Sequence, residues 1–198
     1  MTYFIADLHF GHKNVLAYDN REFPDIETHD AALIEKWNDT VSPSDTVWIL
    51  GDISWYGPGK TCEILDSLNG TKNLCVGNHD SRLMKSRDVR DRFAEIVNYK
   101  ELEDDEWNGI VLCHYPIPCY NHHFNGWLHF YGHVHNSFEE NIMRHVSYEI
   151  NELYMKPCGM FNVGCMMPYM NFRPRTAADI LLLAAREYEN PLANREGL

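Results

Sequence analysis

Residues 3–9 read Tyr3-Phe4-Ile5-Ala6-Asp7-Leu8-His9, an apolar run that ends in a carboxylate and an imidazole. Strands of parallel sheets read as short, continuous apolar stretches, so the run predicts a buried strand. Similar runs occupy residues 46–50, 73–76, 110–113 and 128–131, and each is followed by polar side chains. In an open α/β sheet, residues just past the carboxyl ends of strands gather along one edge, where ligands bind. The sequence therefore predicts an α/β fold with one polar site built from several loops.

The polar residues after these runs form a set of short motifs. They are Asp7-Leu8-His9, Gly51-Asp52, Gly77-Asn78-His79-Asp80, Cys113-His114 and Gly132-His133-Val134-His135. Carboxylate, amide and imidazole ligands together suit borderline divalent metals better than a thiolate site would. A single motif of this kind means little, but their joint occurrence at strand ends predicts a binuclear metal site.

Two details of the motifs suggest how the ligands are delivered. The Asp52 carboxylate has two oxygens and is suited to bridge ions that lie roughly 3.5–4 Å apart in two-metal hydrolytic sites. In Asp7-x-His9 and His133-x-His135, an extended chain would point both side chains of a pair in the same direction. We therefore expect each pair to reach the metal site from one strand end.

Composition limits the class of protein and of partner. The chain has 198 residues, of which 44% are hydrophobic and 23% charged, which fits a single globular domain over residues 1–198. The formal net charge of −12 disfavours nucleic acid and anionic membranes as partners. No signal peptide and no apolar stretch of ~20 residues is visible, so we expect a cytoplasmic protein that does not bind membranes.

The six cysteines show no CxxC spacing, and Cys75 and Cys113 fall within the apolar runs. We expect reduced and mostly buried thiols.

The remaining segments give a coarse helix map. Helical spacing or helix signals mark residues 28–41, 58–70, 80–93 and 176–185. The acidic residues 101–106 predict an exposed turn between strands, and residues 190–198 a frayed tail. Residues 136–156 read as a strand pair or a loop over the site, and the pattern does not decide between them.

The ordered motifs over residues 7–135, with the late Phe161-Asn162-Val163-Gly164, resemble those of the calcineurin-like metallophosphoesterase family. The resemblance implies a four-layer α/β/β/α sandwich of two mixed β-sheets flanked by helices. It also implies hydrolysis of a phosphodiester or phosphomonoester by a hydroxide that bridges two metal ions.

The resemblance further implies a ligand set. Asp7, His9, Asp52 and His135 would hold one ion; Asp52, Asn78, His114 and His133 would hold the other. The ions would be divalent or of mixed valence, and Mn, Fe, Zn, Ni and Co all suit the donors.

The chain departs from the Ser/Thr protein phosphatases, which continue the second motif as Gly-Asp-x-x-Asp-Arg-Gly. Here Trp55 and Tyr56 stand at the acid and arginine positions. A protein phosphatase is therefore not expected, and the small phosphoesterase type fits better.

Other residues are candidates around the metals. His79 is the expected catalytic residue, as general acid or as a stabiliser of transition-state charge. His12 and Arg21 are candidate substrate contacts, the arginine through a phosphate oxygen. Asp80 either orients a neighbouring group or starts a helix.

Further histidines and aromatic residues leave alternatives open. His122 and His123 are weaker candidates for the cleft, whereas His29 and His145 are expected to face solvent. The loop aromatics either stack a nucleobase or close the edge of a core; they are Trp55, Tyr56, Tyr115, Tyr120, Phe124 and Trp127.

The expected partner is a small phosphoester, for which a nucleotide-derived substrate is one option. A metal-dependent nuclease is the alternative within enzymes, although the acidic composition argues against it. A non-catalytic binding scaffold on the same fold is the alternative from another class. Such scaffolds lose ligands, whereas this chain keeps the whole expected set.

Overall fold

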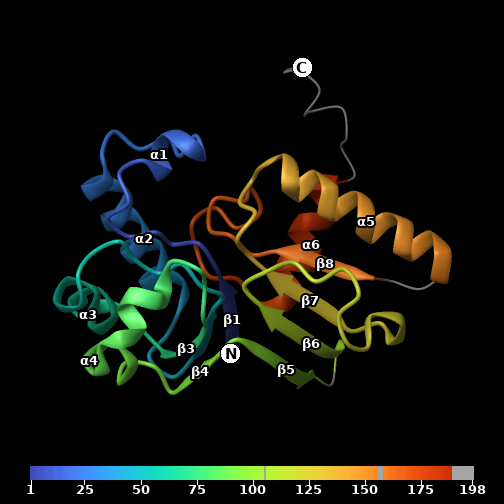
Figure 1. Cartoon of the computed structure of the whole chain (residues 1–198), viewed down its shortest axis with the longest axis horizontal. Coiled ribbons are helices and arrows are strands. Elements are labelled where there is room, and N and C mark those ends of the chain that lie inside the picture. The colour runs from blue at the N-terminus through green and yellow to red at the C-terminus, as the bar shows by residue number, and fades with distance from the viewer. Residues whose placement is uncertain (105, 156–157, 189–198) are drawn as a thin grey trace.

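The computed structural model describes residues 1–104, 106–155 and 158–188. Within them lie two four-stranded β-sheets flanked by helices, which confirms the predicted α/β architecture (Figure 1). The predicted tail of residues 190–198 lies outside the described residues. Of the helices that the structure describes, none combines the length and apolarity needed to cross a membrane.

The first sheet is built from parallel strands joined by helical crossovers. Its order is β1 (Thr2–Ile5), β2 (Thr46–Ile49), β3 (Thr71–Cys75) and β4 (Glu95–Val97). The connections carry α1 (Val15–Tyr18), α2 (Ile26–Thr40), α3 (Pro58–Ser67), the 3₁₀ helix η1 (Asp80–Lys85) and α4 (Arg87–Arg90). A parallel pair requires such a crossover. All three strand pairs of this sheet are parallel, so only the second of the two sheets predicted to be mixed is in fact mixed.

The second sheet begins with an antiparallel pair. Its order is β5 (Tyr99–Asp104), β6 (Asn108–Cys113), β7 (Leu128–Tyr131) and β8 (Gly159–Asn162), with the last three strands parallel. The short η2 (His123–Asn125), α5 (Phe138–Tyr154) and α6 (Ala177–Tyr188) complete this half of the chain.

Two sequence predictions need correction here. Most of the acidic stretch predicted as a turn is strand β5, an edge strand with Glu101 and Glu103 exposed and Leu102 half-buried. The stretch predicted over residues 136–156 is neither a strand pair nor a loop as far as residue 155, because most of it forms α5; residue 156 lies outside the described residues. Ser137 caps that helix by accepting a hydrogen bond from the Glu139 amide at 3.1 Å.

Local chemistry explains where the other helices begin. Asp25 accepts a hydrogen bond from the Thr28 amide at 2.7 Å and so caps α2. Pro58 occupies the first turn of α3, where its missing N–H costs nothing. Thr176 accepts from the Asp179 amide at 3.2 Å at the start of α6.

The two sheets meet beside β1. The Ala6 amide donates to the Val163 carbonyl at 2.8 Å, and the Phe4 and Phe130 rings pack edge to face at 4.9 Å. The end of β1 is thereby fixed against the segment that follows β8, so loops of both sheets reach the same edge of the molecule. The cysteines are free, and all but Cys119 are buried.

Candidate metal centre

The predicted ligands lie just past the carboxyl ends of five strands. Asp7 and His9 follow β1, Asp52 follows β2 and Asn78 follows β3. His114 follows β6, and His133 and His135 follow β7. The structure brings all seven side chains into one region in which both sheets take part.

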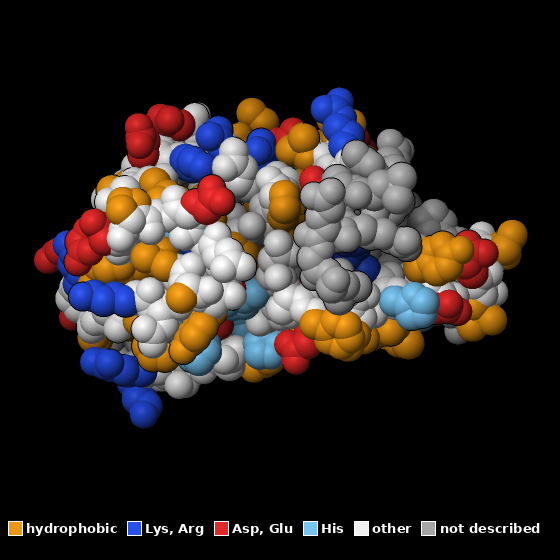
Figure 2. Space-filling model, turned by 90° about the horizontal axis from the view of Figure 1, so that it is seen from above, with side chains coloured by type: hydrophobic (Ala, Val, Ile, Leu, Met, Phe, Trp, Pro, Cys, Tyr) orange, Lys and Arg blue, Asp and Glu red, His pale blue; other side chains and the backbone are white. Residues whose placement is uncertain are grey.

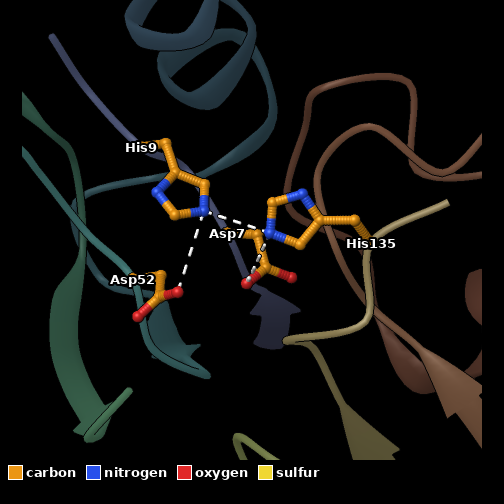
Figure 3. A group of neighbouring side chains, drawn as sticks. All are labelled: Asp7, His9, Asp52 and His135. Atoms are coloured by element: carbon orange, nitrogen blue, oxygen red, sulfur yellow. Dashed lines mark hydrogen bonds and ion pairs between the residues drawn. The ribbon is translucent and has the colours of Figure 1, made fainter. Parts of the chain in front are cut away.

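Four of them form a compact group, which we call the Asp7 cluster. Its members are Asp7, His9, Asp52 and His135, and one potential ligand atom from each lies within 4.8 Å of the others. Figure 3 shows their side chains converging. The His9 Nε2 and His135 Nε2 atoms are 3.2 Å apart, and Asp52 Oδ2 is 3.7 Å from His9 Nε2.

Three further residues extend the site from Asp52, and we call them the Asn78 group. The Asn78 Oδ1 atom lies 2.8 Å from His114 Nε2 and 2.9 Å from His133 Nδ1. His114 Nε2 is also 3.6 Å from Asp52 Oδ2. One oxygen of Asp52, Oδ2, therefore lies within 4 Å of an imidazole nitrogen of the Asp7 cluster and of one in the Asn78 group.

The backbone at these positions is left-handed rather than extended. Asp7, His9, Asp52, His133 and His135 have φ between 52° and 71°. Residues other than glycine rarely adopt this backbone region, because it costs them on the order of 1–2 kcal/mol each. Local strain of this kind is typical of functional sites. The predicted convergence is therefore produced by tight turns, and the alternation argument for the two His-containing pairs is wrong.

Two glycines allow the close approach of these turns. Gly51 has φ +88°, and a Cβ there would overlap Nδ1 of His114. At Gly132, a Cβ would lie 2.6 Å from Asp7 Oδ2. Larger residues would push the ligands apart, which explains why glycine precedes both ligand motifs.

Burial makes the charges of the Asp7 cluster electrostatically costly. The Asp7 and Asp52 side chains are almost fully buried, and burial raises the pKa of both carboxyls. Burial, with the positive charge of neighbouring groups, lowers the pKa of His9. Burial also acts to lower the pKa of His135, but the hydrogen bond to Asp19 and the charge of Asp7 raise it overall.

The donor set fits divalent metal ions. Buried carboxylates that lack a fixed cation are unfavourable, and a bound dication supplies that charge. His114 Nδ1 donates to the Leu50 carbonyl at 2.7 Å, which leaves Nε2 with a lone pair directed at the site. Carboxylate, amide oxygen and neutral imidazole together match the borderline metals.

Asp80 holds the loops rather than the ligands themselves. It is fully buried, and its carboxylate accepts hydrogen bonds from the amides of Asp52, Ile53 and Gly77 at 2.8–3.0 Å. The His79 amide donates to Asp52 Oδ1 at 2.9 Å. The loops after β2 and β3 are thereby tied together beneath the Asp52 carboxylate.

Arg21 lies beneath the site, and its guanidinium is engaged by groups of the same chain. Its guanidinium donates to the carbonyls of Asp7 at 3.0 Å and Leu8 at 3.2 Å, and pairs with Asp19 at 2.8 Å. Its side chain is fully buried. The predicted phosphate contact is therefore not supported, because the donors already hold the turn that carries the Asp7 cluster.

A chain of buried polar groups continues from Arg21. Arg21 Nη1 lies 2.9 Å from His29 Nε2, and His29 Nδ1 lies 2.9 Å from Asp30 Oδ1. Asp30 accepts from the Gly11 amide at 3.0 Å. The prediction that His29 faces solvent is wrong, because its side chain is completely buried between these charges.

Two supporting residues were missed at the level of sequence. Asp19 Oδ1 lies 2.7 Å from His135 Nδ1, and no motif surrounds it. Asn162 Nδ2 donates to the His135 carbonyl at 2.9 Å and to Glu140 Oε2 at 3.0 Å. Asn162 belongs to the late strand-and-turn that the sequence does display, so that signal was available.

An open pocket of about 530 Å³ adjoins the Asp7 cluster, and its lining includes His12 and His79. Figure 2 shows histidine side chains gathered near the middle of one face, with apolar side chains beside them. The pocket lining comprises His9, Gly11, His12, Lys13, Asn14, Val15, Tyr18, Trp55, His79 and His135.

The other candidates divide between the site and the core. Tyr115 is 44% exposed and lies 4.7 Å from the His133 ring, whereas Tyr120 is buried. His122 packs against Trp127 at 4.7 Å, and neither lines the pocket described above. His145 is exposed, as expected.

Several known proteins are similar to this chain in fold or in sequence. A solved structure of a protein of unknown function from Aquifex aeolicus matches with a TM-score of 0.70 and 26% identity. The match covers 92% of this chain and 98% of that one. An uncharacterized protein of Methanocaldococcus jannaschii is 35% identical over 67% of this chain and 68% of its own length.

A phage protein is also similar. The gene 66 protein of Mycobacterium phage L5 is 42% identical over an alignment of 94 residues, and the match covers 44% of this chain and 44% of that one. The model of the calcineurin-like phosphoesterase family matches residues 2–160. That match takes in every predicted metal ligand, and this chain belongs to the calcineurin-like phosphoesterase family.

Proposed function

We propose that the chain is a two-metal phosphoester hydrolase of small substrates. Membership of the family supports metal-dependent phosphoester hydrolysis in general. The observation that carries the two-metal form is the position of Asp52 Oδ2, 3.7 Å from His9 Nε2 and 3.6 Å from His114 Nε2. The Asp7 cluster would hold one ion, and Asp52 with the Asn78 group would hold the other.

Metal ions bound there would lower the pKa of a water nucleophile and neutralise charge on the phosphoryl oxygens. The protein residues would orient the ester and manage protons around it. His79 lines the pocket, and its ring centroid lies 5.8 Å from that of His9. From there its imidazole would protonate the leaving alkoxide, or stabilise charge that develops on it.

We further propose that diesters are hydrolysed at least as well as monoesters. A monoester dianion requires more fixed positive charge than a diester does. Trp55 and Tyr56 replace the acid and arginine of the protein phosphatases, and Arg21 is engaged by protein groups. Lys13 is the cationic side chain among the described residues that line the pocket.

A metal-reconstituted assay tests this proposal. Chelator-treated protein would be loaded separately with Mn²⁺, Fe²⁺, Zn²⁺, Ni²⁺ or Co²⁺ and assayed on bis(p-nitrophenyl) phosphate and p-nitrophenyl phosphate. We expect metal-dependent turnover, with the diester kcat/KM at least equal to that of the monoester. Absence of turnover with every metal would refute the hydrolase. A monoester preference above tenfold would refute the diester preference alone.

A further inference from the structure

One wall of the pocket beside the Asp7 cluster is a row of rings. The His12 ring lies 4.2 Å from Trp55 and 6.2 Å from Tyr18, and Trp55 lies 5.1 Å from His79. Trp55 is 47% exposed and Tyr18 is 74% exposed. The row therefore leads from a group beside the metal site outward along the pocket, with large aromatic surface open to a ligand.

Trp55 is held in place by its surroundings. Its Nε1 lies 3.3 Å from His9 Nδ1, and its ring contacts the rings of His12 and His79. The neighbouring Ser54 hydroxyl accepts from the Tyr56 amide at 3.1 Å, which fixes the turn. A preorganised ring loses little conformational freedom when a ligand stacks on it.

The pocket also carries polar side chains, and its size is limited. Lys13 and Asn14 belong to its lining, so a cation and an amide lie along the same loop as the rings. A volume of about 530 Å³ exceeds what a simple phenyl ester needs. The net charge of −12 disfavours a polymeric polyanion. These features together fit a planar base that is joined through a sugar to one phosphoester.

We infer that this pocket is a nucleoside subsite, so that the substrate is a small nucleoside phosphoester whose base stacks on the Trp55 wall. The inference rests on the proposed function, because the phosphoester would lie at the metal centre. Stacking on an aromatic side chain tolerates every base, since each has a π-face. The subsite therefore selects for a nucleoside and not for one particular base.

Two esters with the same leaving group test the inference. Thymidine 5′-monophosphate p-nitrophenyl ester and methyl p-nitrophenyl phosphate both release p-nitrophenolate, and only the first carries a nucleoside. We expect the thymidine ester to have the higher kcat/KM by about fivefold to a hundredfold. Trp55→Ala should remove most of that preference.

Two further variants separate stacking from other roles of Trp55. Trp55→Phe keeps a ring but loses the N–H that contacts His9, so we expect it to retain most of the preference. If Trp55→Phe behaves like Trp55→Ala, Trp55 acts through His9 and the subsite is refuted. Tyr148→Ala removes an exposed aromatic residue on α5 and should leave the kcat/KM for the thymidine ester and for the methyl ester unchanged.

Failure of the inference differs from failure of the hydrolase. Equal hydrolysis of both esters would overturn the nucleoside subsite and leave the hydrolase standing. If neither ester is hydrolysed, the hydrolase fails, and calorimetry with the metal-loaded protein decides the subsite. Thymidine 5′-monophosphate should then bind more tightly than inorganic phosphate, and Trp55→Ala should abolish the difference. Equal affinities would overturn the subsite.

Discussion

His135 Nδ1 lies 2.7 Å from Asp19 Oδ1, although 116 residues separate the two in sequence. The bond fixes the ring so that Nε2 is directed at Asp7 and His9. Asp19 in turn pairs with Arg21 at 2.8 Å. A carboxylate behind a ligating histidine sets its tautomer and its orientation. The Asp7 cluster is therefore organised from beneath by a buried ion pair.

The first prediction concerns this support. Asp19→Asn should weaken Mn²⁺ binding by roughly 10- to 100-fold, because such partners contribute that much to metal affinity. Calorimetric titration of chelator-treated protein measures the affinity. Asp39→Asn, an exposed change on α2, is the matched control and should bind as the unmodified chain does. Unchanged affinity in a folded Asp19→Asn protein would show that His135 needs no such partner.

The second prediction concerns the stability of the metal-free protein against pH. Burial raises the pKa of Glu140 from 4.5 to about 7, against the hydrogen bonds from Asn162 and Tyr131. Between these two pH values the folded state therefore binds more protons than the unfolded state. The contribution of Glu140 to the free energy of unfolding falls as the pH rises through this interval. Glu140→Gln removes the ionisation and should raise the free energy of unfolding at pH 8 by on the order of 2 kcal/mol.

Urea denaturation at pH 4.5 and pH 8 measures the Glu140 effect. The difference between Glu140→Gln and the unmodified chain should shrink at the lower pH. Glu152 is exposed on the same helix, so the effect of Glu152→Gln on the free energy of unfolding should not depend on pH. A pH-independent difference would mean that ionisation of Glu140 does not govern the effect.

The third prediction separates chemistry from metal binding at His79. His79→Ala should leave both metals bound, because the proposed ligand set does not include its imidazole. The rate should fall by roughly 10²–10⁴ for an ester with an alkoxide leaving group and less for p-nitrophenolate, which leaves without a proton. An equal loss with both substrates would favour an electrostatic role. Loss of metal would show that His79 is a ligand or a support.

The fourth prediction concerns the bridge. Asp52→Asn keeps the size of the side chain but removes a charge from between the two proposed ions. At least one ion should be lost or weakened, and activity should fall on the order of 10²-fold or more. Elemental analysis beside initial rates measures both effects. Two tightly bound ions with an unchanged rate would rule out the bridging role.

Short-range patterns carried most of what the sequence could predict. The apolar run before Asp7 and its counterparts mark strands, and polar residues directly after them fall at one sheet edge by topology alone. For this reason the ligand candidates were identifiable before their distances were known. Helix α2 could also be predicted, because Leu33 and Trp37 recur at helical spacing. Both side chains are buried in the structure.

Features that depend on contacts between residues far apart in the chain could not be predicted from the sequence. Whether Arg21 faces a substrate or the core is decided by Asp19 and by backbone carbonyls that only the folded chain brings near. Helix α5 exposes Phe138 and Leu153, which obscures its apolar face. The Ser137-x-x-Glu140 spacing was a usable helix-start signal. The left-handed turn at His133 has no counterpart in a pattern of residue types.

The central claim is that two metal ions bound around Asp52 support phosphoester hydrolysis. Its most direct test is a titration of chelator-treated protein with Mn²⁺, in which bound metal per chain and the initial rate on bis(p-nitrophenyl) phosphate are followed together. We predict that activity rises with metal content and saturates at two ions per chain. Saturation at one ion, or two bound ions without hydrolysis, would contradict the account.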